Sequence, residues 1–247
     1  MKWVPARFSA AARADRKRAT LALTTPPGPL KDFFVVPPGR LSTPLSRARL
    51  LAVDIETTGL DPRRDLVLAM GWVPIDGLSV RLGGAHGCIV RPPRHPRPVR
   101  GQAVAGPGSV GASAAVHGLT DDVVAEGIPL AQALDELLVA LTGRVLVAHF
   151  ASIERDFLGA ACRAIHGVDL PLTMIDTLEL QRLLVGGPDG AVRPGALRLA
   201  AAREHYGLPR YRAHDALTDA LACAELYLAQ AAHLGRGNDV PLSQVLE

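Results

Sequence analysis

The fold of this chain is decided by the stretch Leu50-Leu51-Ala52-Val53-Asp54-Ile55-Glu56-Thr57-Thr58-Gly59-Leu60, an apolar run that ends in a Thr-Thr-Gly turn. Such a run predicts a buried strand over residues 50–56. Alternate residues of a strand share a face, so the carboxylates of Asp54 and Glu56 project side by side. Two like charges that lose water together persist most easily around a divalent cation. The stretch therefore favours one wall of a metal site, and the alternative is a half-exposed strand with two solvated acids.

Strands and helices are expected to alternate along the rest of the chain. Three strands are predicted near residues 50–56, 65–75 and 78–90. Turn signals at Asp61-Pro62 and Asp76-Gly77 separate them, which predicts an antiparallel meander. Further strands are expected at 145–148 and 172–176, and helices at 129–141, 152–166, from about 177, 197–206 and 216–233. Because strands that alternate with helices pair in parallel, we predict an α/β fold with a mixed five-stranded sheet, in which a three-strand antiparallel meander adjoins the parallel strands and helices flank both.

The composition divides the chain into three regions. Residues 1–49 form a basic, Pro-rich N-terminal extension, residues 50–235 the main domain, and residues 236–247 a short C-terminal tail. Within the extension, the Ala- and Arg-rich segment 6–24 predicts a helix that ends before Pro26-Pro27-Gly28-Pro29. A Pro-rich connector should follow, with Phe33-Phe34-Val35-Val36 as its only apolar anchor.

The charge of the chain is concentrated in its first region. Residues 1–49 hold ten Lys or Arg against two Asp, a net charge of +8, whereas the whole chain of 247 residues carries +3. A basic arm on an acidic domain is expected of a protein that meets a polyanion while its pocket holds carboxylates. The arm either follows the backbone of a nucleic acid or is a solvated tail or a helix packed on the domain, and the sequence leaves both open.

Several classes of protein are excluded by what the sequence lacks. No run approaches the ~18 uninterrupted apolar residues of a membrane span, and Met1-Lys2-Trp3-Val4-Pro5 does not start a signal peptide. Cys88, Cys162 and Cys223 are far apart, so neither a disulfide framework nor a zinc site is indicated. We therefore expect a cytoplasmic protein with no membrane partner.

A second acidic residue of interest follows the predicted strand 145–148. Ser152 is a plausible N-cap, which puts Glu154 in the first turn of the next helix, beside the carboxyl end of the strand. Ligands bind at that edge in α/β sheets. Taken alone, Glu154 is better explained as an acid favoured by the helix dipole.

A third segment, His214-Asp215-Ala216-Leu217-Thr218-Asp219-Ala220, precedes the last predicted helix. Residues five apart on an ideal helix lie about 140° from each other, so His214 and Asp219 converge only if His214 sits on the loop before the helix. That arrangement suits a mobile base next to a fixed metal ligand. Taken alone, His214 is better explained as an exposed loop histidine than as a catalytic residue.

Together these segments resemble the DnaQ-like (DEDDh) 3′–5′ exonucleases of the RNase H-like superfamily, over roughly residues 50–233. The first motif of that family is similar to Asp54–Leu60, the second to Val147–Leu158, and the third to His214–Ala220 with the histidine of this branch. Val116–Thr120 and Ile175–Leu178 also resemble family segments. One departure stands out, because the family normally carries Asp where this chain has Glu154 and Asn where it has Phe150.

The resemblance implies a metal-dependent hydrolase that releases nucleoside 5′-monophosphates from a 3′ end. Asp54, Glu56, Glu154 and Asp219 would hold two Mg²⁺ or Mn²⁺ ions about 3.5–4 Å apart, and His214 would activate the attacking water. The terminal nucleotide would be held by Thr57, Thr58, Gly59 and Leu60, and by His117 in the segment Val116–Thr120. Asp156 is the alternative to Glu154, but two residues along a helix is about 200° of rotation.

The resemblance favours single-stranded DNA as the substrate, since Asp-Ile-Glu-Thr-Thr-Gly looks more like the DNA-directed relatives. It suggests a DNA polymerase or a repair complex as the kind of protein partner, although a stand-alone nuclease is favoured. Two alternatives stay open. One is an exoribonuclease that trims RNA or degrades oligonucleotides, and the other is a catalytically weakened nucleic-acid-binding module in which Glu154 marks a decayed site.

Overall fold

The computed structural model describes residues 5–92, 118–186 and 191–246, with side chains from residue 11 onward. Within these residues one mixed sheet runs through the molecule in the strand order β5-β4-β2-β1-β6-β7, with β3 beside β2. The strands are β1 (Arg49–Thr57), β2 (Val67–Asp76), β3 (Ser79–Val80), β4 (His86–Arg91), β5 (Ile128–Pro129), β6 (Val145–Ala148) and β7 (Met174–Asp176). β2 pairs antiparallel with β1 and β4, whereas β6 pairs parallel with β1 and β7. The predicted mixed α/β fold with its antiparallel meander is confirmed.

The number of strands differs from the five that the sequence predicted. The predicted strand 78–90 is broken into β3 and β4 by the short 3₁₀ helix η2 (Leu82–Gly84). Consecutive glycines weaken a strand, because they have no side chain to pack and lose more backbone entropy. The two-residue strand β5, which pairs in parallel with β4, was not predicted. The described sheet therefore has seven strands.

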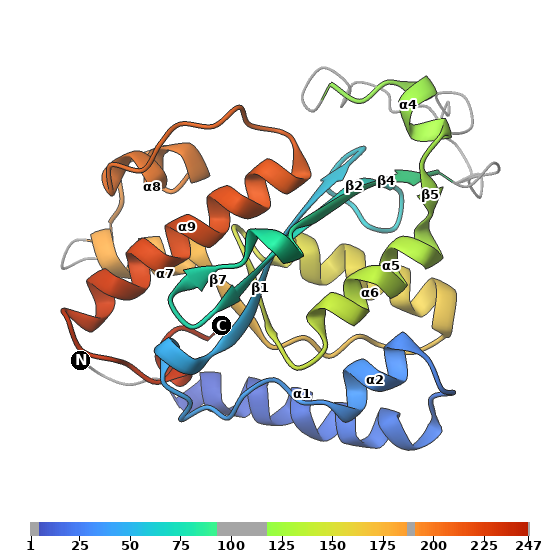
Figure 1. Cartoon of the computed structure of the whole chain (residues 1–247), viewed down its shortest axis with the longest axis horizontal. Helices are drawn as coiled ribbons and strands as arrows, with labels where there is room; N and C mark the ends of the chain where they lie inside the picture. The colour runs from blue at the N-terminus through green and yellow to red at the C-terminus, as the bar shows by residue number, and fades with distance from the viewer. Residues whose placement is uncertain (1–4, 93–117, 187–190, 247) are drawn as a thin grey trace.

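Helices cover both faces of the sheet. α9 contacts β1 and β2 on one face, and α5 contacts the same strands and β4 on the other. Figure 1 shows α7 and α8 on the side of α9, and α6 beside α5. The helices are α1 (Pro5–Thr24), α2 (Pro29–Val35), α4 (Asp121–Ala125), α5 (Leu130–Leu141), α6 (Ser152–His166), α7 (Thr177–Val185), α8 (Leu199–His205) and α9 (Ala216–Gly235), with 3₁₀ helices η1 (Leu45–Arg47) and η4 (Leu242–Gln244). None of the described helices has the length and apolar character needed to cross a membrane.

The N-terminal region packs on the domain. α1 ends where the sequence predicted, but residues 29–35 form the helix α2 in place of a connector. Pro29 at the first helical position explains this helix, because its fixed φ suits a helix start. The guanidinium of Arg18 on α1 is buried, donates to the Phe33 carbonyl oxygen at 2.7 Å and lies 4.0 Å from the centre of the Phe33 ring. The basic region is therefore packed on the domain as helices, and its contact with the backbone of a nucleic acid stays a prediction.

The two end regions of the chain also meet each other. Leu45 N donates to the Val240 carbonyl oxygen at 2.9 Å, and Leu242 N donates to that of Thr43 at 2.8 Å. Leu242, Val245 and Leu246 are buried. Residues 240–246 thus pack against residues 41–46, and the division of the chain at residues 49 and 235 stays a prediction.

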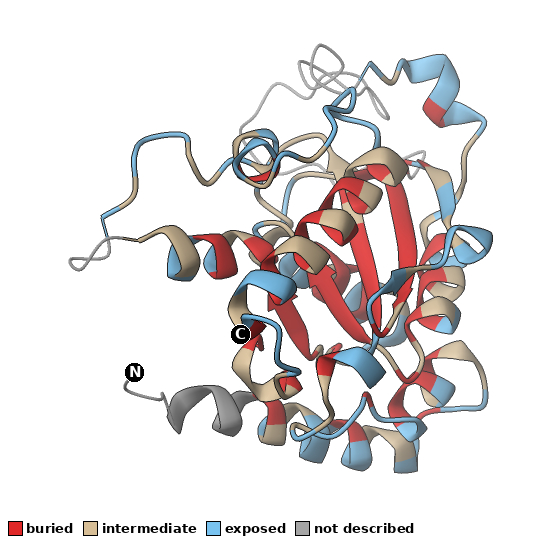
Figure 2. Cartoon of the chain, turned by 60° about the vertical axis from the view of Figure 1, so that its left-hand side comes forward, coloured by how far each residue is buried: buried red, intermediate tan, exposed pale blue. Residues whose placement is uncertain are grey.

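The two faces of β1 have different surroundings, and this difference positions the acidic residues. Leu51, Val53 and Ile55 pack into the core under α5 and α6. Leu50 and Ala52 pack into the core under α9. Because side chains alternate along a strand, Asp54 and Glu56 continue the face of Leu50 and Ala52. These two acids therefore point toward α9, near the start of that helix at Ala216. Figure 2 shows the strands buried between the helical layers.

A glycine in β2 lets the first turn of α9 lie directly on the sheet. Gly71 is the cross-strand partner of Asp54. A Cβ added at Gly71 would lie 2.3 Å from the backbone carbonyl of Ala216 and from Leu217 N. Gly87, which pairs with Gly71, faces the Leu217 side chain, and its added Cβ would lie 3.2 Å from Leu217 Cβ. The missing side chains bring α9 close to Asp54.

Replacing Gly71 by alanine should destabilise the protein, because backbone atoms of α9 cannot move aside as a flexible side chain would. We expect Gly71→Ala to lower the free energy of unfolding by about 1–3 kcal/mol in urea denaturation. Gly83→Ala is the matched control, since its Cβ would meet no atom within 4 Å. Equal losses for the two variants would show that the close approach at Gly71 carries no special cost.

Candidate active site

The end of β1 is shaped by an irregularity between Glu56 and Thr57, where the register with β2 shifts. Such a bulge bends the strand and re-aims the side chains beside it. The turn that follows is tied together by its own polar groups. Thr57 Oγ1 donates to the Gly59 carbonyl oxygen at 2.6 Å, and Asp65 accepts from Thr58 Oγ1 at 3.1 Å and from Asp61 N at 2.8 Å. The predicted substrate-binding turn is thus held in one shape next to Glu56.

Gly59 and Leu60 have different places in this turn. A Cβ added at Gly59 would lie 2.5 Å from the Asp65 carboxylate, so a larger residue would displace the group that organises the turn. The side chain of Leu60 is 76% exposed. The fold thus leaves this apolar side chain in water, four positions after Glu56 in the chain. His117, the other predicted substrate contact, lies outside the described residues.

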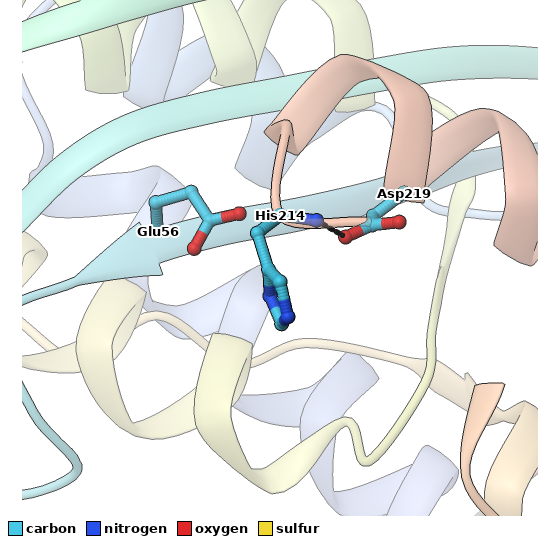
Figure 3. A group of neighbouring side chains, drawn as sticks. All are labelled: Glu56, His214 and Asp219. Carbon is cyan, nitrogen blue, oxygen red and sulfur yellow. Dashed lines mark hydrogen bonds between the residues drawn. The ribbon is translucent and has the colours of Figure 1, made fainter. Parts of the chain in front are cut away.

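The first turn of α9 brings a carboxylate to Glu56, and the loop before α9 brings a histidine. Asp215 caps the helix, its Oδ1 accepting from Thr218 N at 2.8 Å. The loop residue His214 has a left-handed φ of 69° and donates its backbone N–H to Asp219 Oδ2 at 2.8 Å. One ligand atom from each of Glu56, His214 and Asp219 lies within 4.8 Å of the others. Figure 3 shows the three side chains together, with the dashed line marking the bond from His214 to Asp219.

Glu154 comes from the first turn of α6 and is buried at 3% exposure. Its charge and the charges of Asp219 and Glu56 raise the pKa of Asp54, after burial as the largest cause. Asp156 is exposed on the same helix and lies 3.4 Å from Arg155 in an ion pair. The structure therefore turns Glu154 toward Asp54 and Asp156 toward solvent, as the helical rotation predicted.

The start of α6 is capped by a residue that the sequence did not point to. Ser152 was the expected N-cap, but Ala151 holds that position and no side chain of the helix caps it. Asp176, at the end of the neighbouring strand β7, accepts instead from Phe150 N at 3.0 Å and from Ala151 N at 2.9 Å. It also accepts from Leu178 N at 2.8 Å and so caps α7. One buried carboxylate thus fixes the turn that presents Glu154.

Phe150 shows how tightly this turn is held. It has a φ of 70°, a conformation that costs a bulky residue on the order of 1–3 kcal/mol. Its side chain is 49% exposed, so apolar burial does not offset that cost fully. The backbone bond to Asp176 holds the conformation in place.

Burial and mutual repulsion make the cluster hard to ionise. Burial, followed by the charges of Asp219 and Asp215, raises the pKa of Glu56 from 4.5 to about 7. Burial and the charge of Asp176 raise the pKa of Glu154, and burial raises that of Asp219 although the His214 N–H opposes it. Glu154 Oε2 is buried without a hydrogen-bond partner. Four converging carboxylates with one unsatisfied oxygen are a donor set that fits hard divalent cations such as Mg²⁺ or Mn²⁺.

Curated proteins similar to this chain are named as DNA polymerase III enzymes and subunits. The DNA polymerase III subunit epsilon of Treponema pallidum is 28% identical over 193 residues, which cover 76% of this chain and 78% of that protein. The PolC-type DNA polymerase III of Thermotoga maritima is 27% identical over 181 residues, or 73% of this chain. The match spans only 12% of the Thermotoga protein.

Solved structures share the fold at low identity. Escherichia coli exonuclease I in complex with a dT13 oligonucleotide superposes with a TM-score of 0.59 at 16% identity, covering 77% of this chain and 42% of that one. The nuclease domain of 3′hExo, a DEDDh family member bound to rAMP, gives 0.57 at 17% identity, covering 78% and 94%. The family model for exonucleases of the RNase T type matches residues 51–227, a range that includes Asp54, Glu56, Glu154 and Asp219. This chain belongs to the DnaQ-like exonuclease family.

Proposed function

We propose that this protein is a divalent-metal-dependent 3′–5′ exonuclease that removes nucleoside 5′-monophosphates from the 3′ end of single-stranded DNA. The observation that carries the proposal is the convergence of Asp54, Glu56, Glu154 and Asp219 beside an exposed histidine. Three separate elements, β1, α6 and α9, deliver these groups to one end of the sheet. Such a cluster has no structural use that offsets its repulsion, whereas two-metal nucleases need it.

In this proposal the four carboxylates would hold two Mg²⁺ or Mn²⁺ ions. Bound ions would neutralise charge on the scissile phosphate and on the leaving 3′-oxygen. His214 accepts the proton of the attacking water, and its exposed position on the loop leaves the ring free to reach that water. The backbone bond from His214 to Asp219 keeps the histidine at the cluster while the ring stays free.

The turn after β1 holds the terminal nucleotide. Its backbone at Thr57, Thr58 and Gly59 has a fixed shape, and the exposed side chain of Leu60 offers an apolar surface to an unstacked base. Contacts of this kind read backbone and base faces in place of sequence. The proposed enzyme therefore selects a free end and not a specific sequence.

DNA is the proposed substrate because the curated relatives are DNA polymerase III components and E. coli exonuclease I binds a dT13 oligonucleotide. The observation that favours the second candidate, an exoribonuclease, is rAMP in the 3′hExo structure. The proposal also includes association with a DNA polymerase, because the similar proteins are DNA polymerase III components. Digesting end-labelled single-stranded DNA and RNA in parallel, with Mg²⁺ and with a chelator, decides between them. A chain that binds both substrates and cleaves neither would be a binding module, and the proposal would be wrong.

Stability should depend on pH in a way that divalent cations reverse. Because the pKa of Glu56 is raised from 4.5 to about 7, the native state binds more protons than the unfolded state between these values. The free energy of unfolding of the metal-free protein should therefore fall as pH rises through this window. Millimolar Mg²⁺ or Mn²⁺ should raise the melting temperature, and more at about pH 8 than at about pH 5. Melting curves with chelator and with metal at both pH values measure this, and parallel pH profiles would contradict metal binding at Glu56.

Removing the imidazole of His214 should slow chemistry and spare metal binding. We expect His214→Ala to lower the single-turnover rate by on the order of 10²–10⁴ while the metal-induced rise in melting temperature persists. His205→Ala, which removes another exposed histidine from α8, is the control and should keep the full rate. A fully active His214→Ala enzyme would remove His214 from the mechanism.

Glu154 and Asp156 give a matched pair of isosteric variants. Glu154→Gln removes a buried charge, so it should raise the melting temperature in chelator at about pH 8 and at the same time abolish most of the turnover with Mn²⁺. Asp156→Asn, on the exposed side of α6, should change neither quantity much. If Asp156→Asn is the inactive variant and Glu154→Gln is active, Asp156 and not Glu154 is the ligand.

A further inference from the structure

The segment that carries His214 has little local support. Residues 209–215, between α8 and α9, are all exposed, and none of them belongs to a helix or strand. His214 itself adopts a left-handed φ of 69°. A segment of this kind samples many conformations unless something outside it restricts them, and a general base must lie within hydrogen-bond reach of its proton. The question is which described contacts hold the segment in place.

Arg203 on α8 supplies the first of these contacts. It is buried at 4% exposure, unlike most arginines. Its Nη1 donates to the Ala222 carbonyl oxygen on α9 at 2.6 Å, and its Nη2 donates to the Pro209 carbonyl oxygen at 2.8 Å. Nη2 also lies 2.8 Å from Glu225 Oε2, in an ion pair. One guanidinium therefore joins α8, α9 and the start of the segment.

Tyr211 supplies the second contact. Its hydroxyl donates to Glu225 Oε1 at 2.9 Å, so Glu225 uses both carboxylate oxygens. The ring of Tyr211 lies under the same guanidinium, with Arg203 Cζ 4.6 Å from the ring centre. A cation held over an aromatic ring is attracted to its face. Arg203, Tyr211 and Glu225 thus form a closed set of contacts three residues before His214.

We propose that Arg203, Tyr211 and Glu225 are positioning residues that hold His214 at the acidic cluster. Glu225 and Asp219 lie on the same helix, α9, so the contacts fix the segment to the element that carries a proposed metal ligand. Asp219 fixes the near end of the segment through His214 N, and Arg203 and Tyr211 fix the far end through Pro209 and Glu225. The inference rests on the proposed role of His214 as the base. None of the three residues contacts the substrate in this account.

The test uses mild substitutions with a matched control. Tyr211→Phe removes the bond to Glu225 and keeps the ring, and Glu225→Gln removes the charge and keeps an acceptor. Glu179→Gln is the control, because exposed Glu179 pairs with Arg182 within α7 and neither residue belongs to the segment 209–215. We expect the first two variants to lower kcat by about 3- to 10-fold, with KM for a labelled oligonucleotide unchanged and the control at the wild-type rate.

Combination with His214→Ala separates positioning from general stability. If the three residues act through His214, Tyr211→Phe and Glu225→Gln should lower the single-turnover rate in the wild-type background and change it little in the His214→Ala background. Equal fold losses in both backgrounds, or no loss in either, would overturn the proposal. The His214→Ala single variant tests the base separately. If it keeps the full rate, the assignment of His214 as the base is wrong, whatever the double variants show.

A readout independent of turnover is the imidazole resonance of His214 in the metal-free protein, identified by its absence in His214→Ala. Tyr211→Phe should shift and broaden this resonance, because the ring samples more environments. Glu179→Gln should leave it in place. If Glu225→Gln does not fold, Tyr211→Phe carries the test, since it keeps the buried ion pair between Arg203 and Glu225. An unchanged resonance in a folded Tyr211→Phe protein would refute positioning.

Discussion

The carboxylates of Asp54, Glu56, Glu154 and Asp219 lose water and approach one another when β1, α6 and α9 come together. Each of these changes disfavours the charged form, and the raised pKa values of all four groups show it. The free energy that holds the cluster together must come from elsewhere in the molecule. It comes from the apolar layers on both sides of the sheet, where Leu51, Val53 and Ile55 pack under α5 and α6, and Leu50 and Ala52 pack under α9.

The acidic end of the sheet is organised by polar contacts that join segments far apart in sequence. Asp176 on β7 caps the turn that presents Glu154, although Asp176 lies 22 positions after Glu154 in the chain. His149 in the same turn contacts Thr177 Oγ1 at 2.9 Å and the Leu197 carbonyl oxygen at 2.8 Å, and burial lowers its pKa. Because a carbonyl oxygen only accepts, Nε2 of His149 carries a proton and donates it to Leu197. The residues around the cluster are therefore fixed before any ligand arrives.

Local sequence patterns predicted the parts of the site that depend on local geometry. The period of two along β1 placed Asp54 and Glu56 on one face, and helical rotation separated Glu154 from Asp156 and kept His214 off the helix. Long-range contacts were not visible in this way. Asp176 as the cap of α6 and the contacts of Arg203 depend on which elements become neighbours. The break between β3 and β4 depends on Gly83 and Gly84, which lie within a run that otherwise predicts one strand. The helix α2 begins at Pro29, in a Pro-rich region that was predicted to be a connector.

The glycine at position 71 allows the distance between the first turn of α9 and the sheet to change in one direction only. Its backbone lies against the carbonyl of Ala216, and its strand partner is Asp54, so the size of the residue at this position sets how near the first turn of α9 comes to β1. No amino acid is smaller than glycine. A substitution at position 71 can therefore push the first turn of α9, and with it Asp219, away from Asp54, but it cannot bring the two closer. The first turn of α9 therefore lies as close to β2 as the side chain at position 71 allows, and every larger residue at this position can only open the acidic end of the sheet.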